Sequence, residues 1–79
     1  MMSDNITHKI VKQIAVLGNS KGSWNKELNL VSWNGRDAKL DVRDWPPDHG
    51  KCGKGITLTY EEARDLCAAL TAFLRSEQL

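Results

Sequence analysis

Residues 37–45 alternate between apolar and polar side chains. The two parities are Ala38, Leu40 and Val42 on one side, and Lys39, Asp41, Arg43 and Trp45 on the other. Alternation with a period of two is typical of a β-strand that buries one face. We therefore expect a strand with an apolar core face, and an outer face that carries cations and an aromatic ring.

Turn signals divide the first part of the chain into four strands, expected at residues 8–17, 24–33, 37–45 and 54–58. Asn34-Gly35 is typical of a type I′ hairpin turn, because both central positions need a positive φ. Pro46-Pro47 ends the third strand, since proline has no N–H to donate. Apolar residues occur at both parities in 8–17, so a bulge, burial on both faces or a helix would each fit that segment.

A helix is expected at residues 60–76, where apolar positions recur with helical spacing. Thr59 and Glu62 form a capping box, in which each side chain can bond the other residue's backbone N–H. The apolar stripe consists of Ala63, Leu66, Cys67, Leu70, Phe73 and Leu74. This stripe is too broad for one small sheet to cover, so we expect a helix of a partner chain to cover the rest.

These elements predict an α+β fold in the order β-β-β-β-α, an antiparallel four-stranded meander followed by one C-terminal helix. We expect one domain over residues 1–79, with a flexible terminus at 1–6, the sheet within 7–59 and the helix at 60–76. The core is expected on the side of Leu28, Leu30, Leu40, Val42, Ile56 and Leu58. The opposite, solvent-facing side is expected to show Asn29, Trp33, Lys39, Arg43, Trp45 and Thr57.

Length and composition predict an oligomeric state and a cellular compartment. A single core is marginal in a chain of 79 residues, so a homo-oligomer is expected. The net charge is +1, but residues 1–59 carry +3 and residues 60–79 carry −2, which places the basic excess in the sheet. No apolar run fits a membrane span or a signal peptide. Two cysteines in different contexts fit a reducing compartment, hence the cytoplasm.

The expected outer face carries the clearest functional signal. Trp33 and Trp45 share it with Lys39 and Arg43. Single-stranded nucleic acid is bound by this combination, because bases stack on aromatic rings and phosphates pair with cations. The alternative is that the tryptophans fill a second small core or a dimer interface, and parity alone leaves both open.

The loop before the fourth strand places Lys51 and Lys54 among glycines, which allow a backbone to approach a phosphate closely. A flexible solvated loop is the alternative, and the order of residues is not that of a P-loop. His49 and Cys52 are too few ligands for a zinc site, and Cys67 is expected to be a buried structural thiol. We therefore expect no metal, no cofactor and no enzymatic activity.

Several segments together resemble the YdbC-like bacterial proteins, which are relatives of the eukaryotic transcriptional coactivator positive cofactor four. They are Lys-Glu-Leu-Asn at 26–29, Val-Ser-Trp-Asn at 31–34, Lys-Leu-Asp-Val-Arg-Asp-Trp at 39–45, Pro-Asp-His at 47–49 and Gly-Lys-Gly-Ile-Thr-Leu-Thr at 53–59. The resemblance covers roughly residues 7–75.

This resemblance implies a strongly curved sheet, a homodimer joined partly through its helices, and binding of single-stranded DNA without marked sequence preference. The contacts that it implies are Arg43 and Trp45 first, then Lys54, Lys51, Lys39, Trp33 and Lys26. The roles of Lys21 and Trp24 stay open, and coactivator activity does not carry over because the serine-rich N-terminal region is missing. The alternatives are a protein-interaction module that binds transcription or repair machinery, and a binder of single-stranded RNA.

Overall fold

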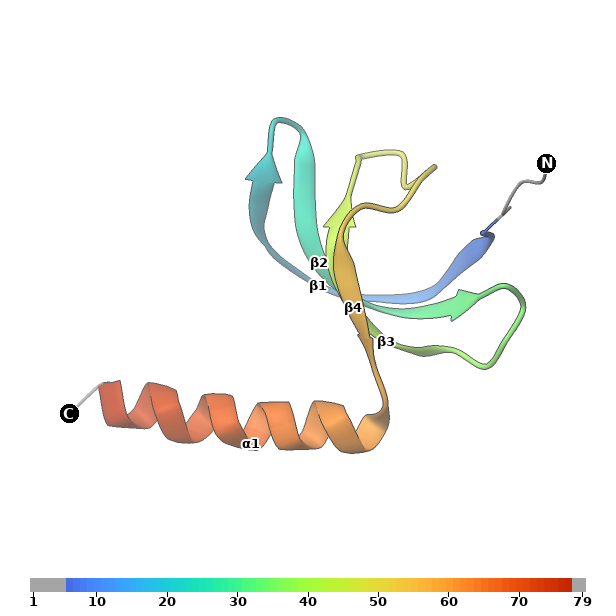
Figure 1. Cartoon of the computed structure of the whole chain (residues 1–79). Coiled ribbons are helices and arrows are strands. Elements are labelled where there is room, and N and C mark those ends of the chain that lie inside the picture. Colours follow the sequence, from blue (N-terminus) through green and yellow to red (C-terminus); the bar gives the residue numbers. More distant parts are fainter. Residues whose placement is uncertain (1–5, 78–79) are drawn as a thin grey trace.

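The computed structural model describes residues 6–77 as a four-stranded antiparallel sheet followed by one helix (Figure 1). The elements are β1 (His8–Lys21), β2 (Trp24–Trp33), β3 (Lys39–Trp45), β4 (Gly55–Leu58) and α1 (Tyr60–Glu77). The strands lie in the order β1-β2-β3-β4, so each pairs with its neighbour in the chain. The expected β-β-β-β-α meander is confirmed. The terminus expected at residues 1–6 lies, apart from Ile6, outside the described residues.

The first strand is longer and less regular than expected. β1 reaches Lys21, where residues 18–23 were expected to turn, and only Gly22, at a φ of 59°, has a left-handed conformation in this turn. Its pairing with β2 shifts register at four places, between residues 10 and 12, 13 and 15, 16 and 18, and 19 and 21. After each shift, the side chains that follow in β1 point to the opposite face of the sheet from the one that simple alternation would give. The bulge interpretation is therefore confirmed, and the helix alternative for residues 8–17 is wrong.

The hairpin between β2 and β3 has the expected turn. Asn34 and Gly35 have φ values of 53° and 75°, and the Arg36 N–H donates to the Trp33 carbonyl at 2.9 Å. These are the features of a type I′ turn. β3 begins at Lys39, two residues later than the expected start at residue 37, because residues 37 and 38 still belong to the connection.

Helix α1 begins with the expected capping box. The Thr59 N–H donates to Glu62 Oε1 at 2.9 Å, and the Glu62 N–H donates to Thr59 Oγ1 at 3.0 Å. Figure 1 shows α1 leaving the end of β4 through a sharp bend, and it contacts the sheet at β3 and β4. None of its described residues is buried. Within residues 6–77, no helix is long and apolar enough to cross a membrane.

Two faces of the sheet differ in burial, and in the opposite sense to the one expected. The polar face holds Glu27, Asn29, Val31, Trp33, Lys39, Asp41, Arg43, Trp45 and Thr57. The leucine face holds Leu28, Leu30, Leu40, Val42, Ile56 and Leu58. On the polar face Val31, Asn29, Asp41 and Trp45 are 0–1% exposed, whereas Ile56 on the leucine face is 55% exposed. Strand parity was predicted correctly, but the side expected to face solvent is the buried one.

The reversal has a simple packing cause. The N-terminal end of β1 and the loop at residues 46–54 close over the polar face, through His8 and His49. Within residues 6–77, α1 is the element that packs on the leucine face, where it lines one side of a groove and leaves it open. For the same reason Cys67, expected to be a buried thiol, is exposed on α1.

Candidate nucleic-acid interface

Four rings pack together at one end of the polar face. The Trp45 centroid lies 4.9 Å from that of His8, 5.6 Å from that of His49 and 6.4 Å from that of Trp33, to which it is nearly parallel at 13°. Trp45 is only 1% exposed, so its expected exposure to solvent is wrong. Trp33 remains half-buried. The two tryptophans thus lie together on one face, as expected, and Trp33 is the more accessible of the two rings.

Arg43 is anchored beside these rings. Its Nε lies 2.8 Å from Asp41 Oδ1, its Nη2 lies 3.0 Å from Asp41 Oδ2, and its Nη1 donates to the Gly53 carbonyl at 3.0 Å. The guanidinium carbon also lies 4.8 Å from the Trp33 ring centroid. Hydrogen bonding to Asp41 raises the pKa of Arg43, with desolvation opposing it. Arg43 therefore links Asp41 on β3, the 46–54 loop and the Trp33 ring.

A second polar network fastens the 46–54 loop to β2. His49 Nε2 lies 3.0 Å from both carboxylate oxygens of Glu27, and Asn29 donates to Glu27 Oε1 at 3.0 Å. His8 Nε2 donates to the His49 carbonyl at 2.9 Å. Buried polar groups that are mutually hydrogen-bonded rigidify a core. Within residues 6–77, no three His, Cys, Asp or Glu side chains gather closely enough to hold a metal ion.

Two glycines let the end of this loop approach β3 closely. A Cβ on Gly55 would overlap the side chain of Arg43 and the carbonyl of Val42. The backbone is paired there, since the Asp44 N–H donates to Lys54 O and the Gly53 N–H donates to Asp44 O, both at 3.0 Å. The Gly-Lys-Gly sequence is therefore required by packing, and it leaves the Lys54 side chain exposed.

The four expected lysine contacts lie at several places. Lys51 and Lys54 are exposed at the loop, and Lys51 Nζ lies 5.9 Å from the Trp24 ring centroid. Lys26 is half exposed and pairs with Asp44 at 3.1 Å. Lys39 is exposed at the start of β3, opposite Val31 of β2. Lys51 thus lies over the ring of Trp24, whose role the sequence left open, and Lys54 is exposed a few residues further along the same loop.

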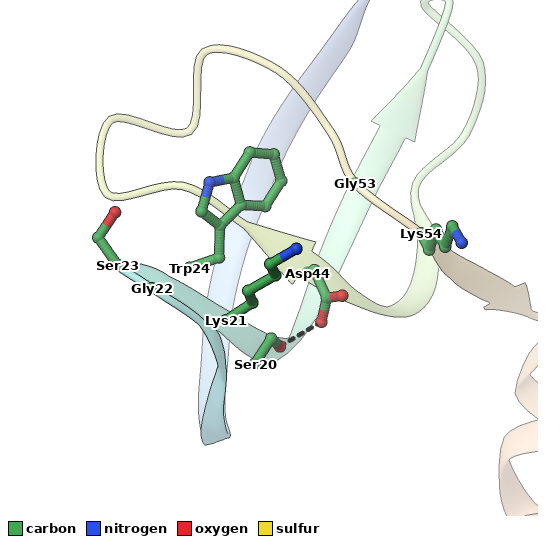
Figure 2. A pocket seen from close by; sticks show the side chains of 8 residues that line it. All are labelled: Ser20, Lys21, Gly22, Ser23, Trp24, Asp44, Gly53 and Lys54. Carbon is green, nitrogen blue, oxygen red and sulfur yellow. Dashed lines mark hydrogen bonds between the residues drawn. The ribbon is translucent and has the colours of Figure 1, made fainter.

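A cleft of about 600 Å³ lies between the β1–β2 turn and the end of the 46–54 loop. Its lining residues are Ser20, Lys21, Gly22, Ser23, Trp24, Asp44, Gly53 and Lys54. Figure 2 shows the Trp24 ring standing in this opening, with Lys21 and Asp44 at its foot and Lys54 at the end away from Ser23. The cleft brings together segments about 20 and 30 residues apart, which strand parity alone could not indicate.

Asp44 is held ionised at the floor of this cleft. It accepts hydrogen bonds from Ser20 Oγ and Lys26 Nζ, both at Oδ1. These bonds lower the pKa of Asp44, the one from Ser20 most, and the charges of Lys26 and Lys54 add to the effect. Asp44 therefore presents a fixed acceptor among exposed cations.

Comparison with known proteins gives a consistent result. The family described as "Transcriptional Coactivator p15 (PC4)", a nucleic-acid-binding and non-enzymatic type of domain, matches residues 20–69. The chain is also 38% identical over 74 residues to an uncharacterized protein of Treponema pallidum (strain Nichols), with 90% of this chain and 87% of that protein covered. The matched segment spans the end of β1, all of β2, β3 and β4, and the first half of α1, and it includes Trp24, Trp33 and Trp45. The chain belongs to the transcriptional coactivator p15 (PC4) family.

Proposed function

We propose that this chain is a non-catalytic protein that binds single-stranded DNA with little sequence specificity. The observation that carries the proposal is the fixed position of Trp33, a half-buried ring held by Arg43 at 4.8 Å and by Trp45 at 6.4 Å. A ring held in this way can stack on a base with little further loss of side-chain freedom. Membership of a nucleic-acid-binding family supports the same function.

In this proposal the residues expected at the site divide into two roles. Trp33 stacks on a base, and the exposed lysines at positions 26, 39, 51 and 54 pair with phosphates. Trp45 and Arg43 do not contact the DNA directly, because Trp45 is buried and Arg43 already donates three hydrogen bonds to Asp41 and Gly53. They position Trp33 and the 46–54 loop.

The test is fluorescence anisotropy with a labelled single strand and with a duplex of the same sequence, each at several salt concentrations. We expect the single strand alone to bind, with log K falling by roughly 0.7 per log unit of salt for each phosphate contact. Replacing Lys51 and Lys54 by alanine should reduce that slope by roughly 1.4. Lys12→Ala on β1, also an exposed lysine, is the matched control and should leave the slope unchanged.

Three outcomes would redirect the proposal. Equal binding to duplex would contradict base stacking, because paired bases are not accessible to Trp33. Tighter binding to the RNA strand of the same sequence would make RNA the ligand. No binding to any nucleic acid would refute the proposal, and would leave interaction with a protein of the transcription or repair machinery as the function to test.

We also propose that the chain is a homodimer that closes the leucine groove. This groove, of about 470 Å³, is lined by Leu17, Leu28, Leu40, Val42, Leu58, Ala63, Leu66, Cys67, Leu70, Thr71 and Leu74. On α1, Leu70 is 49% exposed and Phe73 is 60% exposed. A second copy offers an equally apolar helix face, so a two-fold interface would bury both. This interface would also cover Cys67. We further propose that the protein works in the cytoplasm, because its free thiols Cys52 and Cys67 fit a reducing compartment.

Sedimentation velocity tests the dimer. We expect a mass near twice the chain's 8.9 kDa, and dissociation or unfolding for Leu70→Glu, because a carboxylate would be buried in the interface. Arg64→Glu, which changes an exposed residue of α1 outside the groove, should leave the dimer intact. A monomeric wild-type chain at high micromolar concentration would contradict the proposal.

A further inference from the structure

We infer that the cleft at Trp24 is a separate nucleotide-binding subsite, which holds one unpaired base against the indole and favours bases that carry an amino group. This inference rests on the proposed function and goes beyond it, because it adds a second stacking ring, distinct from Trp33, and a preference among bases. The cleft's volume of about 600 Å³ lies within the range of roughly 300–1,000 Å³ that is usual for small-ligand pockets.

The Trp24 ring is positioned by close packing. A Cβ on Gly53 would lie 2.8 Å from Trp24 Cζ3 and 2.9 Å from the Asp44 carbonyl oxygen, so only glycine leaves room for the ring there. The ring nevertheless remains half-buried rather than enclosed. Trp24 thus has a fixed edge against the loop while part of its surface stays open to the cleft (Figure 2).

The charges around the ring suit a phosphate beside a stacked base. Lys51 Nζ lies 5.9 Å from the Trp24 centroid, and Lys21 and Lys54 line the cleft. The one carboxylate that lines it, Asp44, is already paired with Lys26 at 3.1 Å. The cleft therefore has a surplus of cations, which is the condition for holding a phosphate next to an aromatic platform.

Asp44 provides the chemical basis for a preference among bases. Both hydrogen bonds that the described residues make to its carboxylate end on Oδ1. Oδ2 can therefore accept a hydrogen bond from a ligand. Cytosine, adenine and guanine each carry an exocyclic amino group with two N–H donors that could reach it, whereas an unpaired thymine offers only its single ring N3–H. Asp44 should thus raise the affinity for oligo-dC relative to oligo-dT.

The experiment measures affinities of the full chain for oligo-dC and oligo-dT of equal length at neutral pH. For Trp24→Leu, which keeps an apolar side chain but removes the stacking ring, we expect both affinities to fall by roughly 5- to 150-fold. For Asp44→Asn, we expect the ratio of dC to dT affinity to fall by roughly 3- to 10-fold, because an amide accepts less strongly than a carboxylate. Lys12→Ala is the control and should change neither quantity.

The outcomes separate this inference from the proposed function. Wild-type binding that Trp24→Leu leaves unchanged would overturn the subsite and leave the proposed function standing. An unchanged dC to dT ratio in Asp44→Asn would overturn the base preference. A wild-type chain that binds neither oligonucleotide would refute the proposed function and the subsite with it. If circular dichroism shows that Trp24→Leu is unfolded, Lys21→Ala decides, because this exposed side chain lines the cleft but is not among the contacts of the proposed function. Its loss should weaken binding to both strands, and unchanged binding would overturn the subsite.

Discussion

Replacing Trp45 by alanine is the sharpest test of which face of the sheet forms the interior. The side chain is 1% exposed and packs against His8, Trp33 and His49 at centroid distances of 4.9–6.4 Å. Truncating a buried tryptophan to alanine costs roughly 3–5 kcal/mol, because apolar burial is lost and a cavity remains. That is a large share of the roughly 5–15 kcal/mol that stabilises a typical domain.

Trp45→Phe separates the volume of this ring from its polarity. The Trp45 indole N–H is buried, and it has no hydrogen-bond partner within residues 6–77. An unsatisfied buried donor costs roughly 1–3 kcal/mol. Phenylalanine would remove that donor while keeping an aromatic ring in the cluster, so the loss of volume is partly offset. We therefore expect Trp45→Phe to change the free energy of unfolding by less than about 1.5 kcal/mol.

Urea unfolding followed by far-UV circular dichroism measures both variants. All samples need the same protein concentration, because self-association would shift the midpoints by mass action. A change of less than about 0.5 kcal/mol for Trp45→Ala is what a surface position shows, and it would refute the assignment of Trp45 to the interior. A phenylalanine variant as unstable as the alanine variant would refute the reasoning about the unsatisfied donor.

Three further predictions concern polar contacts. Thr59→Ala removes the acceptor for the Glu62 N–H and should lower the free energy of unfolding by about 1 kcal/mol in urea, whereas Thr59→Ser should not. Asp41→Ala leaves Arg43 beside the buried face without its carboxylate partner, and should cost roughly 3–5 kcal/mol in the same assay. Asp44 has a folded-state pKa below its ordinary value of 3.8, so its stabilisation is fully present above that value and is lost as the pH falls through the folded-state pKa. Asp44→Asn should therefore flatten the decline of the unfolding midpoint that acid causes below about pH 4, and an equally steep decline would contradict this.

Elements specified by local chemistry could be predicted from the sequence. The Asn34-Gly35 turn follows from the need for two positive φ values, and the start of α1 follows from Thr59 and Glu62. The grouping of Trp33, Arg43 and Trp45 on one face follows from strand parity. Each of these depends on residues within one hairpin or one helical turn, so no information about distant segments was needed.

Features that depend on distant segments could not be predicted. Parity separates two faces but does not say which is covered, and here His8 and the 46–54 loop cover the polar one. The four bulges in β1 depend on its pairing with β2. The cleft at Trp24 exists because Gly53 reaches the β1–β2 hairpin. The position of the loop explains both the buried Trp45 and the Trp24 cleft.

The irregular pairing of β1 also bears on how copies of this chain can meet. β1 and β4 are the outermost strands of an open sheet, and such edges offer unpaired N–H and C=O groups to any other strand. β1 changes register four times along its length, and β4 has only 4 residues. Neither edge provides a long, evenly spaced ladder, so strand addition that would lead to aggregation is discouraged at both. The homodimer proposed above would use the leucine groove instead, and a two-fold interface there closes after two copies.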